Sequence, residues 1–294
     1  AQRIQREPSG RRRLDRGHLS VRDETAGGIA VSEVRLEFRN VTKQFRDPNG
    51  TTPETITAVE GVSLSVKDGE VVSLIGPSGC GKSTLLNLAS GLDQPTAGEV
   101  LVDATRVVGP SSHVAFMLQK DLLLPWRSIR ENVELGMEIQ GVSRSEQRER
   151  AMNWLRQCHL ADFANHFPHQ LSGGMRQRAA LARTLVLEPS VLLLDEPFSA
   201  LDAQTKMVLQ QDLAVSIKVN GKTALLITHD LAEAAALSDR VLVMSKRPGH
   251  ITEELVIDVP DRENPLVRRL QLSDHIGHLM KSLDIDHLEL GAAK

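Results

Sequence analysis

The feature that limits most strongly how this chain can fold is a glycine-rich run between an apolar strand and an apolar helix. Residues 70–75 read Glu-Val-Val-Ser-Leu-Ile and predict a buried strand, and Leu85, Leu86 and Leu88 predict a helix after the run. The run has the spacing G-x4-G-K-S, which is typical of a phosphate-binding loop. Its residues are Gly76, Pro77, Ser78, Gly79, Cys80, Gly81, Lys82, Ser83 and Thr84.

Each part of this run suits a bound phosphate. Glycines let backbone N–H groups curl around phosphate oxygens, and the N-terminus of the following helix adds positive potential. Lys82 can reach the outer phosphates of a nucleotide, and the Ser83 hydroxyl can ligate Mg²⁺. A plain glycine-rich turn is the alternative, and the strand before the run and the helix after it disfavour that reading. We expect Cys80 to be a packing residue rather than a redox one.

Strand and helix signals alternate in the second half of the chain, which predicts an α/β fold with a parallel sheet covered on both faces by helices. The expected strands are 191–195, 223–227 and 240–244, and the expected helices are 203–218 and 230–237. Residues 122–186 interrupt this order with helix signals alone, one of them at 145–163, and predict a helical insertion. Near the N-terminus, 34–38 and 62–66 alternate as strands do, and 46–50 reads as a turn.

Composition narrows the class of protein. The 294 residues are 40% hydrophobic and 25% charged, with a net charge of −3, so nothing points to nucleic acid as a partner. No apolar run approaches the ~20 residues that a membrane span needs. The two cysteines, Cys80 and Cys158, form no spacing motif and argue against a disulfide framework. Residues 1–32 are rich in arginine and poor in large apolar residues, so we expect a disordered basic arm there.

Two acidic residues follow the apolar strand at 191–195. In an open parallel sheet, ligands bind at the carboxyl ends of the strands. Asp195 is therefore placed to hold Mg²⁺, and Glu196 to act as general base toward an attacking water. A pair of solvated acids is the alternative, and the phosphate loop earlier in the chain argues against it.

A third motif opens a helix with small residues and offers a second anion-binding helix N-terminus. Its residues are Leu171, Ser172, Gly173, Gly174 and Met175. A plain helix cap is the alternative reading. The phosphate loop already supplies one anion site in this chain, so the plain-cap reading has to be weighed against a second anion-binding site with a separate role.

Together the three motifs resemble the ABC ATPases. The run at 76–84 is similar to the family's Walker A motif, 171–175 to its signature and 191–196 to its Walker B motif. Gln119 stands at the place of the Q-loop glutamine, and His229 at that of the switch histidine. The D-loop positions are Ser199, Ala200, Leu201 and Asp202.

The resemblance spans about 33–260 and implies a P-loop NTPase core with a parallel sheet, an N-terminal antiparallel β part and an inserted helical subdomain at about 122–186. A tail at 261–294 follows, and Ile276, Leu279, Met280 and Leu283 predict a short helix at 273–283. His166 and His169 lie three residues apart, but without further ligands we expect no metal site there.

The resemblance also implies an enzyme that hydrolyses ATP with Mg²⁺. Catalytic roles fall to Lys82, Gln119, Glu196 and His229, with His229 at the γ-phosphate, and the Mg²⁺ ligands are Ser83, Gln119 and Asp195. In the family fold, the phosphate loop and the signature of one chain lie too far apart to share one ATP. The signature is therefore expected to complete the site of a second ATPase subunit, either a second copy or a related chain.

In one place the chain departs from the family pattern. ABC ATPases usually stack adenine on an early tyrosine, and this chain has no tyrosine. Phe45 stands at that place and can stack on a base, although it has no hydroxyl to donate. The alternative is that Phe45 is a core residue.

Two segments are similar to the nitrate, sulfonate and taurine importer branch of the family. They are 116–126 (Phe-Met-Leu-Gln-Lys-Asp-Leu-Leu-Leu-Pro-Trp) and 239–249 (Asp-Arg-Val-Leu-Val-Met-Ser-Lys-Arg-Pro-Gly). This branch implies a peripheral subunit on the cytoplasmic face of the bacterial plasma membrane that powers uptake of small anions. Its partners would be transmembrane permease subunits and, indirectly, a substrate-binding protein, with no nucleic acid.

Residues 122–126 follow Gln119 and are expected to dock the permease, with plain core as the alternative. Two other functions remain open at this point: a soluble ABC ATPase without a transport role, and an exporter ATPase. The single compact cassette favours a transporter, and the branch similarity favours import. The transported molecule is not expected to touch this chain.

Overall fold

The computed structural model describes residues 34–46, 55–219, 221–260 and 264–283. The described residues all belong to one compact unit. The basic arm expected at 1–32 and nearly all of the turn expected at 46–50 lie outside the described residues.

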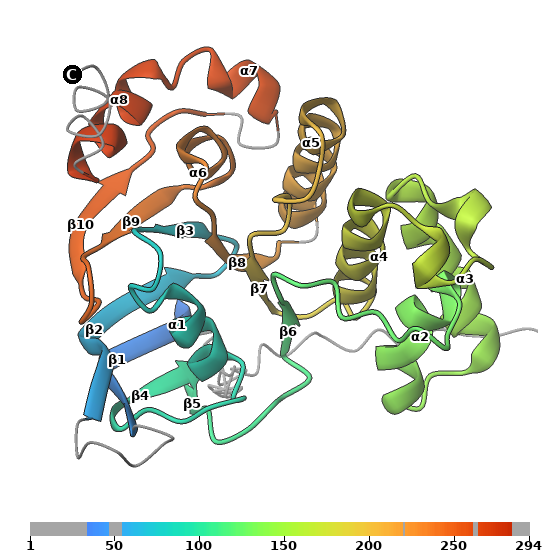
Figure 1. Ribbon diagram of the computed structural model, residues 1–294, viewed down its shortest axis with the longest axis horizontal. Coiled ribbons are helices and arrows are strands. Elements are labelled where there is room, and N and C mark those ends of the chain that lie inside the picture. Colours follow the sequence, from blue (N-terminus) through green and yellow to red (C-terminus); the bar gives the residue numbers. More distant parts are fainter. Residues whose placement is uncertain (1–33, 47–54, 220, 261–263, 284–294) are drawn as a thin grey trace, which may run out of the picture. The chain divides into compact units, whose positions relative to one another are not determined.

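A six-stranded sheet carries the centre of the fold, with the strand order β10-β9-β3-β8-β7-β6 (Figure 1). The neighbouring strands from β9 to β6 pair in parallel, and β10 adds an antiparallel edge. The strands are β3 Val71–Ile75, β6 Val114–Met117, β7 Val191–Asp195, β8 Thr223–Ile227, β9 Arg240–Met244 and β10 Ile251–Val256. The parallel sheet predicted from the sequence is therefore confirmed.

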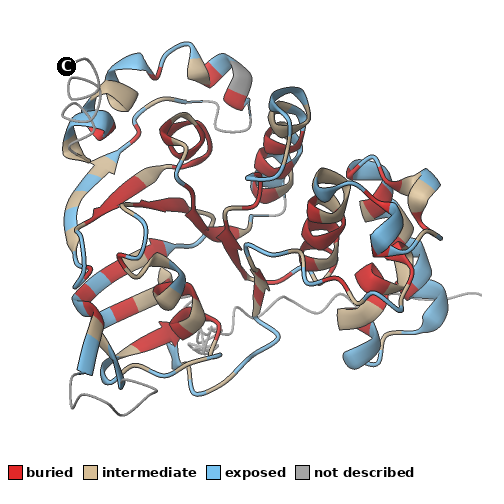
Figure 2. Cartoon of the chain, viewed as in Figure 1, coloured by how far each residue is buried: buried red, intermediate tan, exposed pale blue. Residues whose placement is uncertain are grey.

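Helices cover both faces of this sheet because its strands are apolar on both sides. Successive residues of a strand face opposite sides. On β7, Leu192 and Leu194 pack in a core that includes helix α4 (Gly173–Leu185) and helix α5 (Ala203–Val219). Val191 and Leu193 pack in a second core with helix α1 (Lys82–Ala89). Figure 2 shows the resulting continuous band of buried strand residues.

A second, antiparallel sheet has the order β2-β1-β4-β5. Its strands are β1 Val34–Arg46, β2 Thr55–Lys67, β4 Ala97–Val102 and β5 Thr105–Arg106. β1 and β2 are much longer than the stretches predicted at 34–38 and 62–66. The register shifts between Phe38 and Val41, where Asn40 has a positive φ of 49°. Such a bulge breaks the alternation of apolar residues, which is why the sequence pattern stopped short.

Residues between β6 and β7 form helices and no strand, as predicted for 122–186. They are α2 Ile129–Ile139, α3 Arg144–Gln157 and α4, with two short 3₁₀ turns at Ala161–Phe163 and Pro168–Gln170.

The helix predicted at 145–163 was too long at its C-terminal end. α3 stops at Gln157 because His159 adopts a φ of 53°. The His159 N–H donates to Arg156 O at 3.0 Å, and the Leu160 N–H donates to Leu155 O at 2.7 Å. This pair of bonds is the Schellman motif, which ends helices at a left-handed residue.

The C-terminal helices pack on α6 (Leu231–Leu237). They are α7 Pro265–Arg269 and α8 Ser273–Ser282, and α8 lies where a helix was predicted at 273–283. Leu279 of α8 is fully buried in the core that contains α6, and buried Arg268 donates to Ala236 O at the end of α6. Among the described helices, none has both the length and the apolar composition of a membrane span.

Candidate functional site

The phosphate loop joins the buried strand β3 to helix α1. Gly81 precedes α1 with a φ of 105°, and a Cβ placed there would lie 2.4 Å from Val59 Cγ1. Only glycine fits this position, because both its φ and the close β2 strand exclude a side chain. The Lys82 ammonium donates to Gly76 O at 2.7 Å and to Pro77 O at 3.0 Å. Lys82 therefore lies folded back over the loop, where an incoming phosphate would meet it.

Asp195 lies at the carboxyl end of β7 and is almost fully buried, with 6% of its surface exposed. Burial raises the pKa of its carboxyl group, and the negative charge of Glu196 adds to that rise. A hydrogen bond from Ser83 and the charge of Lys82 act in the opposite direction on the same pKa. Thus the structure places the two predicted Mg²⁺ ligands Ser83 and Asp195 in contact.

Glu196 has a left-handed backbone with a φ of 49°, a conformation that costs a non-glycine residue roughly 1–2 kcal/mol. Its N–H donates to Ile227 O at 2.9 Å, so the neighbouring strand β8 holds this geometry.

The Glu196 carboxylate lies between two residues from other strand ends. Gln119, which follows β6, donates from Nε2 to Glu196 Oε2 at 3.1 Å. His229, which follows β8, places Nδ1 3.3 Å from Glu196 Oε1. β6, β7 and β8 are neighbours in the sheet, so their carboxyl ends meet at one edge. The structure therefore brings together Gln119, Glu196 and His229, which lie far apart in the sequence.

Gln119 and Glu196 line a cavity of about 470 Å³, which we call the phosphate-loop cavity, whereas His229 is not among its lining residues. Its walls include Ser78, Gly79, Gly81, Lys82, Ser83, Thr84, Gln119, Asp195 and Glu196. Phe45 forms part of the rim and is 40% exposed, with the Lys43 ammonium 5.1 Å from its ring centre. The reading of Phe45 as a core residue is therefore wrong. Sequence reasoning missed four further wall residues, Ile56, Ala58, Ile227 and Arg247.

The signature residues lie at the start of α4, away from this cavity. Ser172 caps α4 by accepting from the Met175 N–H at 3.3 Å. No residue of 171–175 is among the described residues that line the phosphate-loop cavity. Gly173 instead borders a groove of about 440 Å³ with Gln119, Leu122 and Ala200.

α4 also makes contacts that the sequence did not suggest. Buried Gln177 donates to Glu196 O at 2.9 Å and accepts from the Ala200 N–H at 2.8 Å. Arg176 pairs with Asp121 at 3.0 Å, and Arg183 donates to Asp121 O at 2.6 Å. The segment after Gln119 is thus tied to the helix that begins at the signature.

The residues after Gln119 divide between core and surface. Leu123 is buried in the core of the helical segment, whereas Leu122 is 54% exposed and Trp126 is 71% exposed. The plain-core reading of 122–126 is therefore wrong for these two side chains. Trp126 lies beside a cavity of about 620 Å³. The other walls of this cavity are Arg127 and mostly charged residues of α2 and α3.

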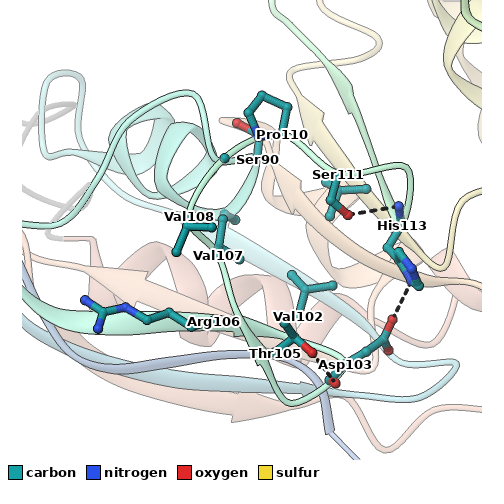
Figure 3. A pocket seen from close by; sticks show the side chains of 13 residues that line it. Ser90, Val102, Asp103, Thr105, Arg106, Val107, Val108, Pro110, Ser111 and His113 are labelled. Carbon is teal, nitrogen blue, oxygen red and sulfur yellow. Dashed lines mark hydrogen bonds and ion pairs between the residues drawn. The ribbon is translucent and has the colours of Figure 1, made fainter. Parts of the chain in front are cut away.

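In the part of the chain that the structure describes, the cysteines and the metal-ligating side chains form no second site. Both cysteines are buried and free, and burial raises the pKa of the Cys158 thiol to about 12. Within the described residues, no three His, Cys, Asp or Glu side chains gather as a metal cluster. A separate cavity of about 310 Å³ lies at the C-terminal end of α1. Among the residues that line it, His113 Nδ1 lies 3.0 Å from Asp103 Oδ2 (Figure 3). No residue of the three motifs lines it.

Comparisons with known proteins agree with this arrangement. The family model for ABC transporters matches residues 59–199. The nitrate import ATP-binding protein NrtD of Synechocystis sp. is 39% identical over 266 residues, which cover 87% of this chain and 98% of that protein. The chain belongs to the ABC transporter ATP-binding proteins. As a member of this family of ATPases, it binds and hydrolyses ATP.

Two further similarities place this ABC ATPase within the family. The taurine import ATP-binding protein TauB of Yersinia pestis is 45% identical over 205 residues, 70% of this chain and 80% of that protein. Among solved structures, the ATP-binding cassette MJ0796, described as a dimer in a post-hydrolysis state bound to ADP and Pi, superposes with a TM-score of 0.69. It is 36% identical and covers 76% of this chain and 98% of its own. The family and fold expected from the sequence are therefore confirmed.

Proposed function

We propose that this ABC ATPase powers a membrane importer of small anions of the nitrate, sulfonate or taurine type. The observation that carries the proposal is the position of Gln119, which contacts Glu196. The segment that follows Gln119 in the sequence exposes the side chains of Leu122 and Trp126. One segment thus spans the hydrolysis site and an apolar surface. The similarity to the nitrate and taurine import proteins supports the importer branch and the class of cargo.

In this proposal the motif residues divide the work on ATP. Lys82 and the N–H groups of the phosphate loop hold the phosphates. Glu196 accepts a proton from the attacking water, and Gln119 and His229 hold its two carboxylate oxygens toward the cavity. We also assign His229 a contact to the γ-phosphate. Phe45 at the rim stacks on the adenine.

The oxygen-rich group of Ser83, Asp195 and Gln119 fits a Mg²⁺ ion. Hydroxyl, carboxylate and amide oxygens are the hard ligands that Mg²⁺ prefers. Burial raises the pKa of Asp195, so its ionised form gains from a nearby cation. When bound, Mg²⁺ would neutralise charge on the transferred phosphate.

Two partners complete the proposed assembly. The signature 171–175 does not line the chain's own cavity, so a second ATPase subunit, either a copy or a related chain, would use it. Permease subunits would dock at the Leu122–Trp126 surface, on the cytoplasmic face of the bacterial plasma membrane. A substrate-binding protein would deliver the anion to the permease without touching this chain, and nucleic acid has no part.

The catalytic assignment is tested by Glu196→Gln, with Glu149→Gln as the matched control on the exposed side of α3. Glu196→Gln removes the proton acceptor and keeps the shape, so turnover should fall by about 10²–10⁴-fold while ATP still binds. Lys82→Ala should instead weaken ATP binding itself. The measurements are steady-state phosphate release and equilibrium binding. Normal turnover by Glu196→Gln would show that another group is the base.

The importer assignment is tested in liposomes reconstituted with this ATPase and a permease that co-purifies with it. Addition of the partner binding protein loaded with nitrate, a sulfonate or taurine should stimulate ATP hydrolysis and deliver the anion inward. Outward transport, or ATPase activity that no permease alters, would favour the exporter or the soluble alternative.

A further inference from the structure

The loop between β9 and β10 lies against the phosphate loop, although it belongs to none of the three motifs. It consists of residues 245–250, Ser-Lys-Arg-Pro-Gly-His. All of these except His250 belong to one of the two segments that resemble the importer branch. The loop is internally fixed, because the Ser245 N–H donates to His250 O at 3.0 Å and the Ser245 hydroxyl donates to Pro248 O at 3.1 Å.

Gly249 fastens this loop to the nucleotide site. Its N–H donates to Ala58 O at 2.9 Å, and its carbonyl accepts from the Glu60 N–H at 3.0 Å. A Cβ at Gly249 would lie 1.9 Å from Cys80 O, so only glycine permits this approach to the phosphate loop. The 245–250 loop is thus bonded to β2 and lies in close contact with the phosphate loop.

Arg247 uses this position to reach the phosphate-loop cavity. Its Nε donates to Gly79 O at 3.1 Å, and its side chain lines the cavity together with Phe45 and Lys82. Within the described residues, Arg247 forms no ion pair. A guanidinium carries five N–H donors, so the Gly79 bond leaves four for another acceptor. The other cationic side chain that lines the cavity, Lys82, shares its wall with two carboxylates, Asp195 and Glu196.

We propose that Arg247 is a second phosphate-binding cation of the ATP site and that it donates to oxygens of the nucleotide's phosphate chain. Three features favour phosphate over the base. The anchor at Gly79 is part of the phosphate loop, the fork of a guanidinium matches phosphate oxygens, and Phe45 supplies an apolar platform for the base. The inference rests on the proposed nucleotide site and adds a residue to it.

The test compares the equilibrium affinity of Mg·ATP for wild type, Arg247→Ala, Arg247→Lys and Lys246→Ala. Lys246 is the exposed neighbour in the same loop and does not line the cavity, so it controls for the loss of one positive charge. Arg247→Ala should weaken binding by about 2- to 12-fold, the size expected for one hydrogen-bonding contact. Arg247→Lys should recover part of that loss, and Lys246→Ala should bind as wild type does.

Ionic strength separates a phosphate contact from a purely structural role. Salt screens an exposed charge, so the loss in Arg247→Ala should shrink between about 0.05 M and 0.5 M salt. Three results would overturn the proposal: wild-type affinity in Arg247→Ala, an equal loss in Arg247→Lys that salt does not change, or an equal loss in Lys246→Ala. Lys82→Ala is measured in parallel, because wild-type binding in that variant would instead refute the nucleotide site itself.

Discussion

The buried Asp195 carboxyl group lowers the free energy of unfolding of the chain, although the site needs it for function. Its carboxyl group is buried, and burial raises its pKa, so the ionised form is less stable in the folded chain than in the unfolded one. Asp195→Asn removes the charge and retains an oxygen for the Ser83 hydrogen bond. The free energy of unfolding of the variant should therefore be about 0.5–2 kcal/mol higher than that of wild type at neutral pH in the absence of Mg²⁺. The variant should also lose ATPase activity. Urea unfolding and phosphate release measure the two effects.

The pH dependence of that gain has a defined sign. Below the ordinary pKa of 3.8, the carboxyl is protonated in both states, so wild type and Asp195→Asn should be equally stable. Above 3.8, the unfolded chain ionises first because the folded pKa is higher, and the gain should grow until the folded carboxyl also ionises. Exposed Asp162→Asn is the control. A gain that is the same at pH 3 and pH 7 would assign the effect to packing.

Phe45 is the residue proposed to stack on the adenine base in a chain that has no tyrosine. Its ring is exposed at the cavity rim, so Phe45→Ala should raise the KM for ATP, and Phe45→Tyr should not. Stacking on a base is worth roughly 1–3 kcal/mol in nucleic-acid complexes, which corresponds to about 5- to 150-fold in KM if it carries over. Exposed Ile56→Ala, on the neighbouring strand, measures the effect of simple apolar truncation at the rim. Equal effects of both substitutions would argue against stacking.

Strands and helices that depend on local pattern were predicted well. β7, β8 and β9 match the predicted ranges, because each is a short apolar run with polar neighbours. β1 and β2 were predicted only in part, because their bulges reset the alternation on which the prediction depends. α3 was overextended, because an apolar pattern continues through Leu160 although the chain turns at His159.

The residues of the candidate site likewise fall into those that the sequence indicated and those that it did not. Motif order assigned Gln119, Glu196 and His229 to one ATP site, and the structure adds that Gln119 and His229 both contact Glu196. Motif order did not indicate the bonds of Gln177 and Arg247, because they join segments 19 and 168 residues apart through side chains that carry no local signal. The one cue at Arg247 was its place within a segment that resembles the importer branch.

The segment 119–126 gives a prediction about docking. Its path is fixed by Arg176 and Arg183, while Trp126 remains 71% exposed. Trp126→Asp should therefore release the ATPase from its permease and leave the isolated subunit folded and able to bind ATP. Burial of one large apolar side chain is worth roughly 1.5–3 kcal/mol, so the affinity should fall by about 10- to 150-fold.

The matched control for Trp126→Asp is Val108→Asp, which places the same charge at a side chain that is 79% exposed elsewhere on the chain. Co-purification with the permease and thermal melting give the two readouts. An intact Trp126→Asp complex would place the docking surface elsewhere, and an unfolded variant would contradict the exposure of the side chain.

The separation of the signature from the phosphate-loop cavity predicts a composite site between two chains. Each ATP would lie between the Lys82 of one subunit and the Ser172 of the other, as a symmetric dimer allows. Lys82→Ala and Ser172→Arg should each be inactive, since every site of either homodimer has a defect. In a mixed dimer, one site pairs the intact Lys82 with the intact Ser172, and the other site holds both defects.

Equal amounts of the two inactive proteins should therefore regain up to about a quarter of the wild-type ATPase activity, since random pairing makes half of the dimers mixed and each has one of two sites intact. ATP retained on the mixture is measured as well, because a dimer that needs both sites for turnover would still bind at the intact one. Ser143→Arg is the control: Ser143 caps α3 as Ser172 caps α4, and it lies outside the signature. It should keep full activity, which separates loss of a helix cap from loss of the site. A mixture that neither hydrolyses nor retains more ATP than its two components would show that each chain completes its own site.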